Sequence, residues 1–273
     1  MRPTHAGLQS ALLATLALSA GQVRAEETLP RELEGVGVEE RLGAMIDPDL
    51  PFTDHTGARV TLGKYLDDGI PVLLTLNYYR CKMLCNLQLN AVVEGLKGLE
   101  WKPGENFRIV TISIDPREGW ELGRDKRASY LETLGRGEVD WSFLVGRDED
   151  VRTVARTVGF SYKYDQEQDQ YAHTAAIFFL SPEGKVSRYL YGVDYPSQSL
   201  KFALMEASEG RIGTTIDKVI LSCFHYDSSI GAYGPFAFGI MRLGAALTAT
   251  LLIGWLGVMF ARDRLRRRAE DGI

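Results

Sequence analysis

The chain has 273 residues, a formal net charge of −5 at pH 7 and only three cysteines. Its one concentrated basic stretch is the arginine-rich RDRLRRR close to the C-terminus. This charge pattern disfavours nucleic-acid binding, which requires a basic stripe on the folded domain.

The first 25 residues have the three parts of a secretory signal peptide. Arg2 supplies the basic start, the apolar stretch SALLATLALSA follows, and small residues precede a cleavage site after Ala25. An uncleaved anchor is the weaker alternative, because this stretch is shorter than the roughly 20 residues that a membrane span needs. Export would place the protein in an oxidising compartment, where thiols form disulfides. Residues 26–47 are charged and contain glycine, and they are predicted to form a tether.

Residues 48–212 are predicted to form one α/β domain. FTDHTGARVTL predicts a hairpin, the continuous apolar run IPVLLTLN predicts a strand buried on both faces, and FRIVTISI predicts a second buried strand. Leucine and valine recur at helical spacing between these two runs. The later predicted elements are a helix at 122–134, the strand VDWSFLV, a helix at 148–158, the hairpin AAIFFLS–KVSRYLYG and a helix at 197–209. This order predicts a thioredoxin-like fold, in which helices flank a central mixed sheet, with one inserted strand–helix unit.

Two of the three cysteines lie in the stretch NYYRCKMLCN, between the first buried strand and the following helix. A helix N-terminus stabilises thiolates, and four-residue spacing predicts that Cys81 and Cys85 share one helical face. Structural roles are the alternative, but a disulfide that closes so short a loop stabilises a fold little. We therefore interpret the pair as metal ligands or as a redox dithiol.

His173 is the candidate third ligand. It precedes an apolar run that should neighbour the cysteine-bearing strand in a thioredoxin-like sheet. Two thiolates and one imidazole suit Cu(I), and they also hold Cu(II) or zinc. His55 lies in a predicted hairpin turn and is interpreted as a solvated polar residue, while Met83 is interpreted as a packing residue rather than an extra soft ligand.

The C-terminal part of the chain is predicted to anchor the protein in the cytoplasmic membrane by a single span. Residues 213–235 carry aromatic residues typical of a membrane interface, and also Cys223 and His225. These two residues are interpreted as incidental, with a second copper site or a docking element as the alternative. Residues 236–261 contain an uncharged run long enough for a transmembrane helix in contact with membrane lipid. The positive-inside tendency places the basic tail at 262–273 in the cytoplasm and the main domain in the periplasm or another extracytoplasmic space.

Three motifs together resemble the Sco/SenC copper chaperones over nearly the whole exported domain: the helix-leading C-x-x-x-C, VTISIDPRE and AHTAAIFFLSPEGKV. The resemblance implies a thioredoxin-like fold that binds copper through Cys81, Cys85 and His173. It also implies a partner, because family members assist assembly of the binuclear copper centre of cytochrome c oxidase. Some members are described as reductants of the cysteines of that centre.

This chain departs from the commoner family pattern in two ways. The usual motif has proline after each cysteine and an aspartate between them, where this chain has Lys82, Met83 and Asn86. The family is usually tethered through an N-terminal helix, whereas the anchor predicted here is C-terminal. Both departures affect the surface that a partner would meet more than the candidate ligands.

Two functions remain consistent with the sequence. The first is a metallochaperone that hands copper to a subunit of a copper-dependent membrane oxidase. The second is an enzyme, a thiol–disulfide oxidoreductase in which Cys81 attacks a partner disulfide, Cys85 resolves the mixed disulfide and a thiol reductant restores the dithiol. The presence of His173 and the wide cysteine spacing favour copper, and both roles can coexist because copper loading requires the reduced dithiol. A membrane-spanning sensor is a weaker alternative, since the short tail offers little effector machinery.

Overall fold

The computed structural model describes residues 35–66, 68–81, 84–208, 224–227, 232–235 and 237–270. The predicted signal peptide at 1–25 lies outside these residues, as do Met83 and Cys223. For Cys85 and His225 the backbone is described and the side chain is not.

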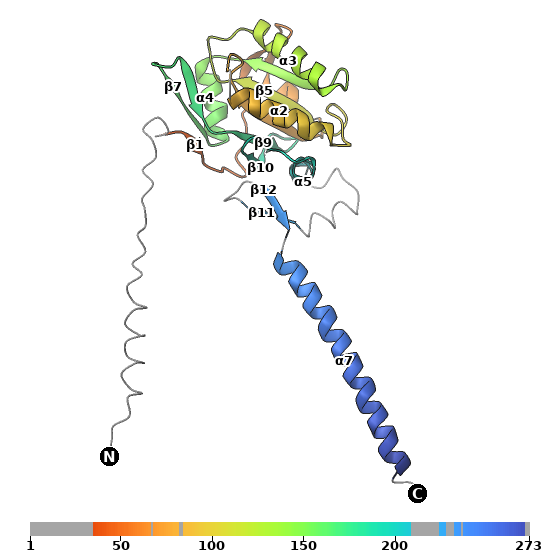
Figure 1. Ribbon diagram of the computed structural model, residues 1–273. Helices are drawn as coiled ribbons and strands as arrows, with labels where there is room; N and C mark the ends of the chain where they lie inside the picture. Colours follow the sequence, from red (N-terminus) through yellow and green to blue (C-terminus); the bar gives the residue numbers. More distant parts are fainter. Residues whose placement is uncertain are drawn as a thin grey trace, which may run out of the picture. The chain divides into compact units, whose positions relative to one another are not determined.

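A seven-stranded mixed sheet forms the centre of the domain (Figure 1). Its order is β10-β9-β4-β5-β6-β2-β3, with β4, β5 and β6 parallel and the other pairs antiparallel. The strands are β2 (Pro51–Asp54), β3 (Arg59–Thr61), β4 (Val72–Asn77), β5 (Arg108–Ser113), β6 (Trp141–Val145), β9 (Ala176–Leu180) and β10 (Val186–Tyr191). β9 lies beside β4, which confirms the predicted neighbourhood of the cysteine-bearing strand.

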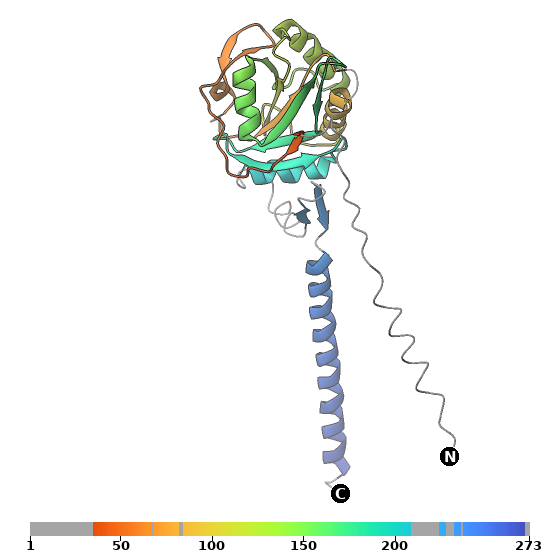
Figure 2. The same cartoon turned by 90° about the vertical axis from the view of Figure 1, so that its left-hand side faces the viewer.

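Helices cover both faces of this sheet, and neighbouring residues of β4 show how. Leu73 packs with residues of α2, α3 and α5, whereas Leu74 packs with residues of α4, because successive side chains of a strand point to opposite faces. The helices are the 3-10 helix η2 (Leu62–Tyr65), α2 (Leu84–Lys97), α3 (Trp120–Leu134), α4 (Asp148–Thr157) and α5 (Ser197–Ala207). α5 runs along β9 and β10 (Figure 2). The mixed sheet between two helical layers confirms the predicted thioredoxin-like α/β fold class.

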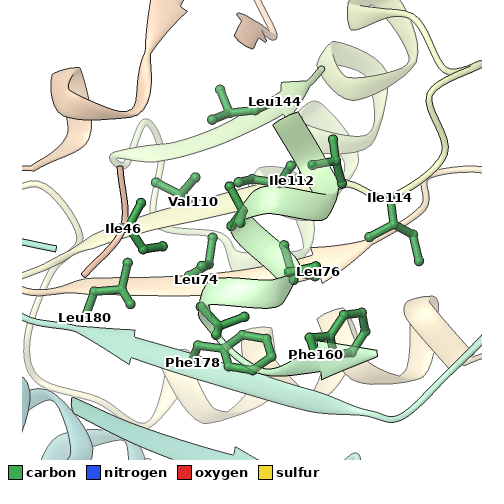
Figure 3. Packing of buried hydrophobic residues seen from close by; sticks show 14 of the residues in the cluster. Ile46, Leu74, Leu76, Val110, Ile112, Ile114, Leu144, Phe160, Phe178 and Leu180 are labelled. Carbon is green, nitrogen blue, oxygen red and sulfur yellow. The ribbon is translucent and has the colours of Figure 1, made fainter. Parts of the chain in front are cut away.

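The core on the α4 side extends to the segment that carries His173. Leu74, Val110, Leu144 and Phe178 come from four adjacent strands and meet in one buried cluster (Figure 3). Phe160 belongs to the same cluster and contacts Phe178 edge to face, with ring centroids 5.8 Å apart. This core therefore supports Phe160, whose ring also lies beside that of His173.

A second, three-stranded sheet of order β1-β7-β8 was not predicted. Its strands are β1 (Gly37–Val38), β7 (Phe160–Asp165) and β8 (Gln170–His173), all antiparallel. Part of the segment predicted as a tether is therefore ordered against the domain through β1. Gly159 permits this approach, because it has a φ of +68° and any Cβ there would lie 1.8 Å from the carbonyl oxygen of Glu39.

Beyond the domain, β11 (Phe224–Asp227) and β12 (Ala232–Pro235) form an antiparallel hairpin in which His225 is opposite Gly234. α7 (Ala237–Glu270) is a single helix of 34 residues. None of the helices in the described part of the chain combines the length and the apolarity needed to cross a membrane. The prediction of a transmembrane helix at 236–261 is therefore not confirmed.

Candidate metal site

Cys81 lies in a turn directly after β4. Its backbone N–H donates to the carbonyl oxygen of Tyr78 at 3.3 Å, and its side chain is buried. α2 begins at Leu84, so Cys85 is in the first helical turn while Cys81 precedes the helix. This placement differs from the prediction that both sulfurs share one helical face, because the chain turns between β4 and α2.

His173 is the last residue of β8, and its imidazole is only 6% exposed. The Cys81 thiol lies close enough to raise the pKa of this imidazole electrostatically. The fold thus brings Cys81 and His173 together, although 92 positions separate them in the sequence. No group of three His, Cys, Asp or Glu side chains suitable for a metal occurs among the described side chains, which do not include that of Cys85.

One hydrogen bond determines which nitrogen of His173 carries the proton. Nδ1 lies 3.1 Å from the carbonyl oxygen of Thr174. A carbonyl oxygen only accepts, so Nδ1 must be the protonated nitrogen, and Nε2 keeps its lone pair. Burial lowers the pKa of His173 by more than Thr174 and Cys81 raise it. The imidazole is therefore neutral near pH 7, in the tautomer that a metal-binding histidine with a backbone acceptor adopts.

Aromatic rings pack against His173. Tyr78 meets the His173 ring edge-on with centroids 6.2 Å apart, and Phe160 lies 5.8 Å from the same ring. Tyr171 packs against Tyr78 at 5.5 Å. This aromatic wall limits the access of water to the imidazole, and such a shell controls solvent access to a metal site.

Comparison with known proteins decides the family. The sequence model described as SCO1/SenC matches residues 38–204 of this chain. The chain belongs to the SCO1/SenC family. The resemblance seen in the sequence motifs is therefore confirmed.

Individual relatives are distant. Protein SCO2 homolog, mitochondrial, from Bos taurus is 27% identical over 199 residues, which cover 69% of this chain and 71% of that protein. A crystal structure of an Aquifex aeolicus VF5 protein, 23% identical, superposes with a TM-score of 0.54 over 61% of this chain and 94% of that chain. The copper-bound structure of ScoI from Arabidopsis thaliana is 21% identical and covers 60% of this chain and 98% of that chain, with a TM-score of 0.46. The Aquifex structure supports the assignment of the fold.

In this Sco-family domain, a buried pair of amide side chains lies beneath the candidate site. Asn77 Nδ2 donates to Gln88 Oε1 at 2.8 Å, and Gln88 Nε2 donates to the carbonyl oxygen of Ala176 at 2.6 Å. Both side chains are completely buried. These bonds join the end of β4, the first part of α2 and the start of β9. Sequence analysis missed them, and the one available signal was a polar residue at a strand end and another on an otherwise apolar helix face.

A second connection runs through the loop after β5. Arg117 donates from Nε to Asp115 at 2.8 Å and from Nη1 to Asp169, in the turn between β7 and β8, also at 2.8 Å. Burial by itself would raise the pKa of Asp115, but the hydrogen bonds from Arg117 outweigh burial and lower it. The Asp-Pro loop is thereby joined to the hairpin that ends in His173.

The remaining predicted histidine positions lie elsewhere in the fold. His55 is in the turn between β2 and β3, where the Phe143 N–H donates to its Nδ1 at 3.5 Å. It is half-buried rather than solvated as predicted, and burial lowers the pKa of its imidazole. His225 is in β11, where the structure describes its backbone and not its side chain.

Proposed function

We propose that this Sco-family protein is a copper chaperone that delivers copper to the copper centre of a respiratory oxidase. Cys81, Cys85 and His173 would hold the copper as cargo. The observation that supports this assignment best is the buried Cys81 thiol beside a neutral imidazole whose Nε2 retains its lone pair. Membership of the SCO1/SenC family supports the same function.

The chemistry of the three side chains is matched to Cu(I). Thiolates are soft ligands that select Cu(I), and imidazole is a suitable third ligand. Metal uptake requires both thiols to be reduced and to lose their protons, so oxidation to a disulfide would prevent loading. Cys85 enters this proposal through its position in the first turn of α2, close in sequence to Cys81.

Copper binding tests the proposal directly. The purified, reduced chain is expected to bind one Cu(I), with sulfur and nitrogen ligands visible by X-ray absorption. Cys81→Ser, Cys85→Ser and His173→Ala should each lower the affinity strongly, because a three-ligand site loses its geometry with any one member. His55→Ala is the matched control and should bind copper as the parent does. An unchanged affinity in His173→Ala would contradict the proposal.

Reduction of the partner's cysteines is the second candidate function. It is favoured by the position of Cys85 in the first turn of α2, where the helix N-terminus stabilises a thiolate. In this reaction the Cys81 thiolate would attack the partner disulfide and release one partner thiol. Cys85 would then displace the second partner thiol and leave a Cys81–Cys85 disulfide.

Attachment to a membrane on the exported side is the third part of the proposal. It is supported by the sequence, in which no charged residue occurs at 243–261 and five arginines follow. It is also supported by the side chains of α7 that the structure describes, among which nine large apolar ones are exposed: Leu247, Leu251, Leu252, Ile253, Trp255, Leu256, Val258, Met259 and Phe260. Burial of such a surface in lipid would be favourable.

A further inference from the structure

Glu118 is a buried carboxylate on the loop between β5 and α3, and it is only 5% exposed. Its Oε2 accepts from the backbone N–H of Tyr79 at 2.7 Å, and its Oε1 accepts from the backbone N–H of Arg80 at 2.7 Å. Ser113 donates its hydroxyl to Oε2 at 2.6 Å. One side chain therefore satisfies two consecutive backbone donors.

These two donors are the central N–H groups of the turn that ends at Cys81. The bond that closes the turn, from Cys81 N–H to the Tyr78 carbonyl oxygen, is long at 3.3 Å. Consecutive N–H groups of a turn form a concave site for an anion, and here the Glu118 carboxylate fills it. Hydrogen bonds to a charged acceptor are about twice as strong as neutral ones, so they constrain the turn more than its own closing bond does.

The Tyr79 side chain holds the same turn from the opposite direction. Its hydroxyl donates to the carbonyl oxygen of Leu144 at 2.7 Å and also lies 3.2 Å from that of Thr111. Tyr79 is thus fixed at its backbone by Glu118 and at its ring by the central sheet. The position of the next two residues, including Cys81, depends on both attachments.

We propose that Glu118 is the positioning residue of the Cys81 turn. Its carboxylate binds the Tyr79 and Arg80 amides and so keeps Cys81 against His173. The consequence for copper rests on the function proposed above, whereas the positioning itself does not. The Asp-Pro loop after β5 would then serve the site by supplying this carboxylate from the strand adjacent to β4.

The test uses the full chain with Cys85→Ser and Cys223→Ser, so that Cys81 is its single thiol. Glu118→Gln keeps the size of the side chain but turns an NH₂ group toward one of the two backbone N–H donors. The Tyr79 or the Arg80 N–H thereby loses its acceptor. Glu121→Gln, at an exposed carboxylate three residues later, is the matched control. Hydrogen exchange of the Tyr79 and Arg80 amides and the alkylation rate of Cys81 are measured in each variant.

In Glu118→Gln, exchange at these amides and alkylation of Cys81 should both become at least about fivefold faster, as the loss of a buried hydrogen bond predicts. Amides of β4 should keep their protection, which separates a local role from general destabilisation. If Glu118→Gln does not fold, Glu118→Asp provides the same readouts, because it keeps the charge on a side chain that is one methylene shorter. Unchanged exchange and alkylation, or an equal loss of protection in β4, would overturn the positioning role.

Copper is measured separately, with Cys85 and Cys223 restored. Glu118→Gln should bind Cu(I) with lower affinity than Glu121→Gln, because an unheld turn must be ordered when the metal binds. Equal copper affinities would overturn the consequence for copper. A parent chain that binds no copper would refute the proposed function, while exchange and alkylation would still decide the role of Glu118.

Discussion

Asp54 shows how hydrogen bonds set the charge of a single buried residue in this fold. It is the last residue of β2 and is 3% exposed. Its carboxylate accepts from the Thr56 N–H at 2.9 Å, from the Thr56 hydroxyl at 2.6 Å and from Lys64 Nζ at 3.1 Å. Burial alone would raise the pKa of Asp54, but these bonds outweigh it and hold the pKa at about 2. The same residue closes the turn between β2 and β3.

Acid titration is expected to reveal this contribution. The unfolded Asp54 titrates near 3.8 and the folded one near 2, so the unfolded state binds more protons between these values. The stabilisation is complete above about pH 5 and is lost progressively as the pH falls through 3.8 toward 2, and this shift corresponds to about 2 kcal/mol. Asp54→Asn should lower the free energy of unfolding at pH 7 and flatten its fall in acid, as measured by urea unfolding between pH 2 and 7. The exposed Asp49→Asn is the control, and an equally steep fall in Asp54→Asn would contradict the assignment.

At the scale of elements, the buried Asn77 and Gln88 side chains hold together the three segments that carry the candidate ligands. β4 leads into the Cys81 turn, α2 contains Cys85, and β9 follows His173. Apolar packing alone specifies the distance between these elements less closely than hydrogen bonds that need particular partners. Asn77 Nδ2, Gln88 Oε1 and Gln88 Nε2 all have buried partners, while Asn77 Oδ1 has none among the described residues, so the arrangement of the three segments depends on the bonds that are made.

Replacing Gln88 should therefore lower the stability of the fold. Gln88→Met keeps a similar volume but leaves Asn77 Nδ2 and the Ala176 carbonyl oxygen without their acceptor and donor, at a cost of about 2 kcal/mol or more. Asn90→Met on the exposed side of α2 should change stability by less than about 0.5 kcal/mol. In a double-mutant cycle by urea unfolding, Asn77→Leu and Gln88→Met should couple by about 1 kcal/mol. Additive effects would show that the two amides act independently.

The elements that the sequence predicts well are those with one strong hydrophobic pattern. β4 and β5 are rich in leucine, isoleucine and valine, and nearly all of their residues are buried as expected. The hairpin of β7 and β8 was missed because it alternates aromatic and polar residues over two short strands joined by a polar turn. Such a pattern resembles a solvated loop unless the partner strand is known.

The same limit applies to the site. Cys81 and His173 were predicted to meet because both adjoin strands whose order follows from the fold class. Glu118 and Gln88 were not predicted, because each acts on backbone groups that are distant in sequence, 38 or more positions away. A polar residue in a loop or on a helix face gives no sequence signal for such a partner.

At the scale of the whole molecule, the proposed membrane topology is tested by reporter fusions. A reporter active only outside the cytoplasm should be active after residue 200, and one active only inside should be active after residue 270. The arginine cluster at 262–268 is the physical reason, since basic residues are retained on the cytoplasmic side. Replacing the five arginines by glutamine should weaken this preference. A cytoplasmic residue 200 would place the thiols in a reducing compartment and contradict export.

Delivery of copper and reduction of cysteines make different demands on the whole protein, and His173 separates them. His173→Ala removes one proposed copper ligand and leaves both thiols able to exchange. In cells that carry only this variant, a delivery role predicts low activity of the copper-dependent oxidase, with partial recovery when copper is added. A reducing role predicts near-parental oxidase activity in cells that carry His173→Ala. In cells that lack the protein, it predicts that an external thiol reductant restores oxidase activity and that copper does not.

We expect cells that carry His173→Ala to have low oxidase activity, which added copper restores in part. A neutral imidazole with its proton fixed on Nδ1 serves to bind a metal and is not required for thiol exchange. His55→Ala is the control, since that histidine lies in a different turn and should leave oxidase activity unchanged. Oxidase activity, copper content and the amount of the oxidase subunit in the membranes are measured together, so that loss of the subunit is distinguished from loss of its metal. Parental oxidase activity in His173→Ala would mean that copper transfer through this site is not the function of the protein.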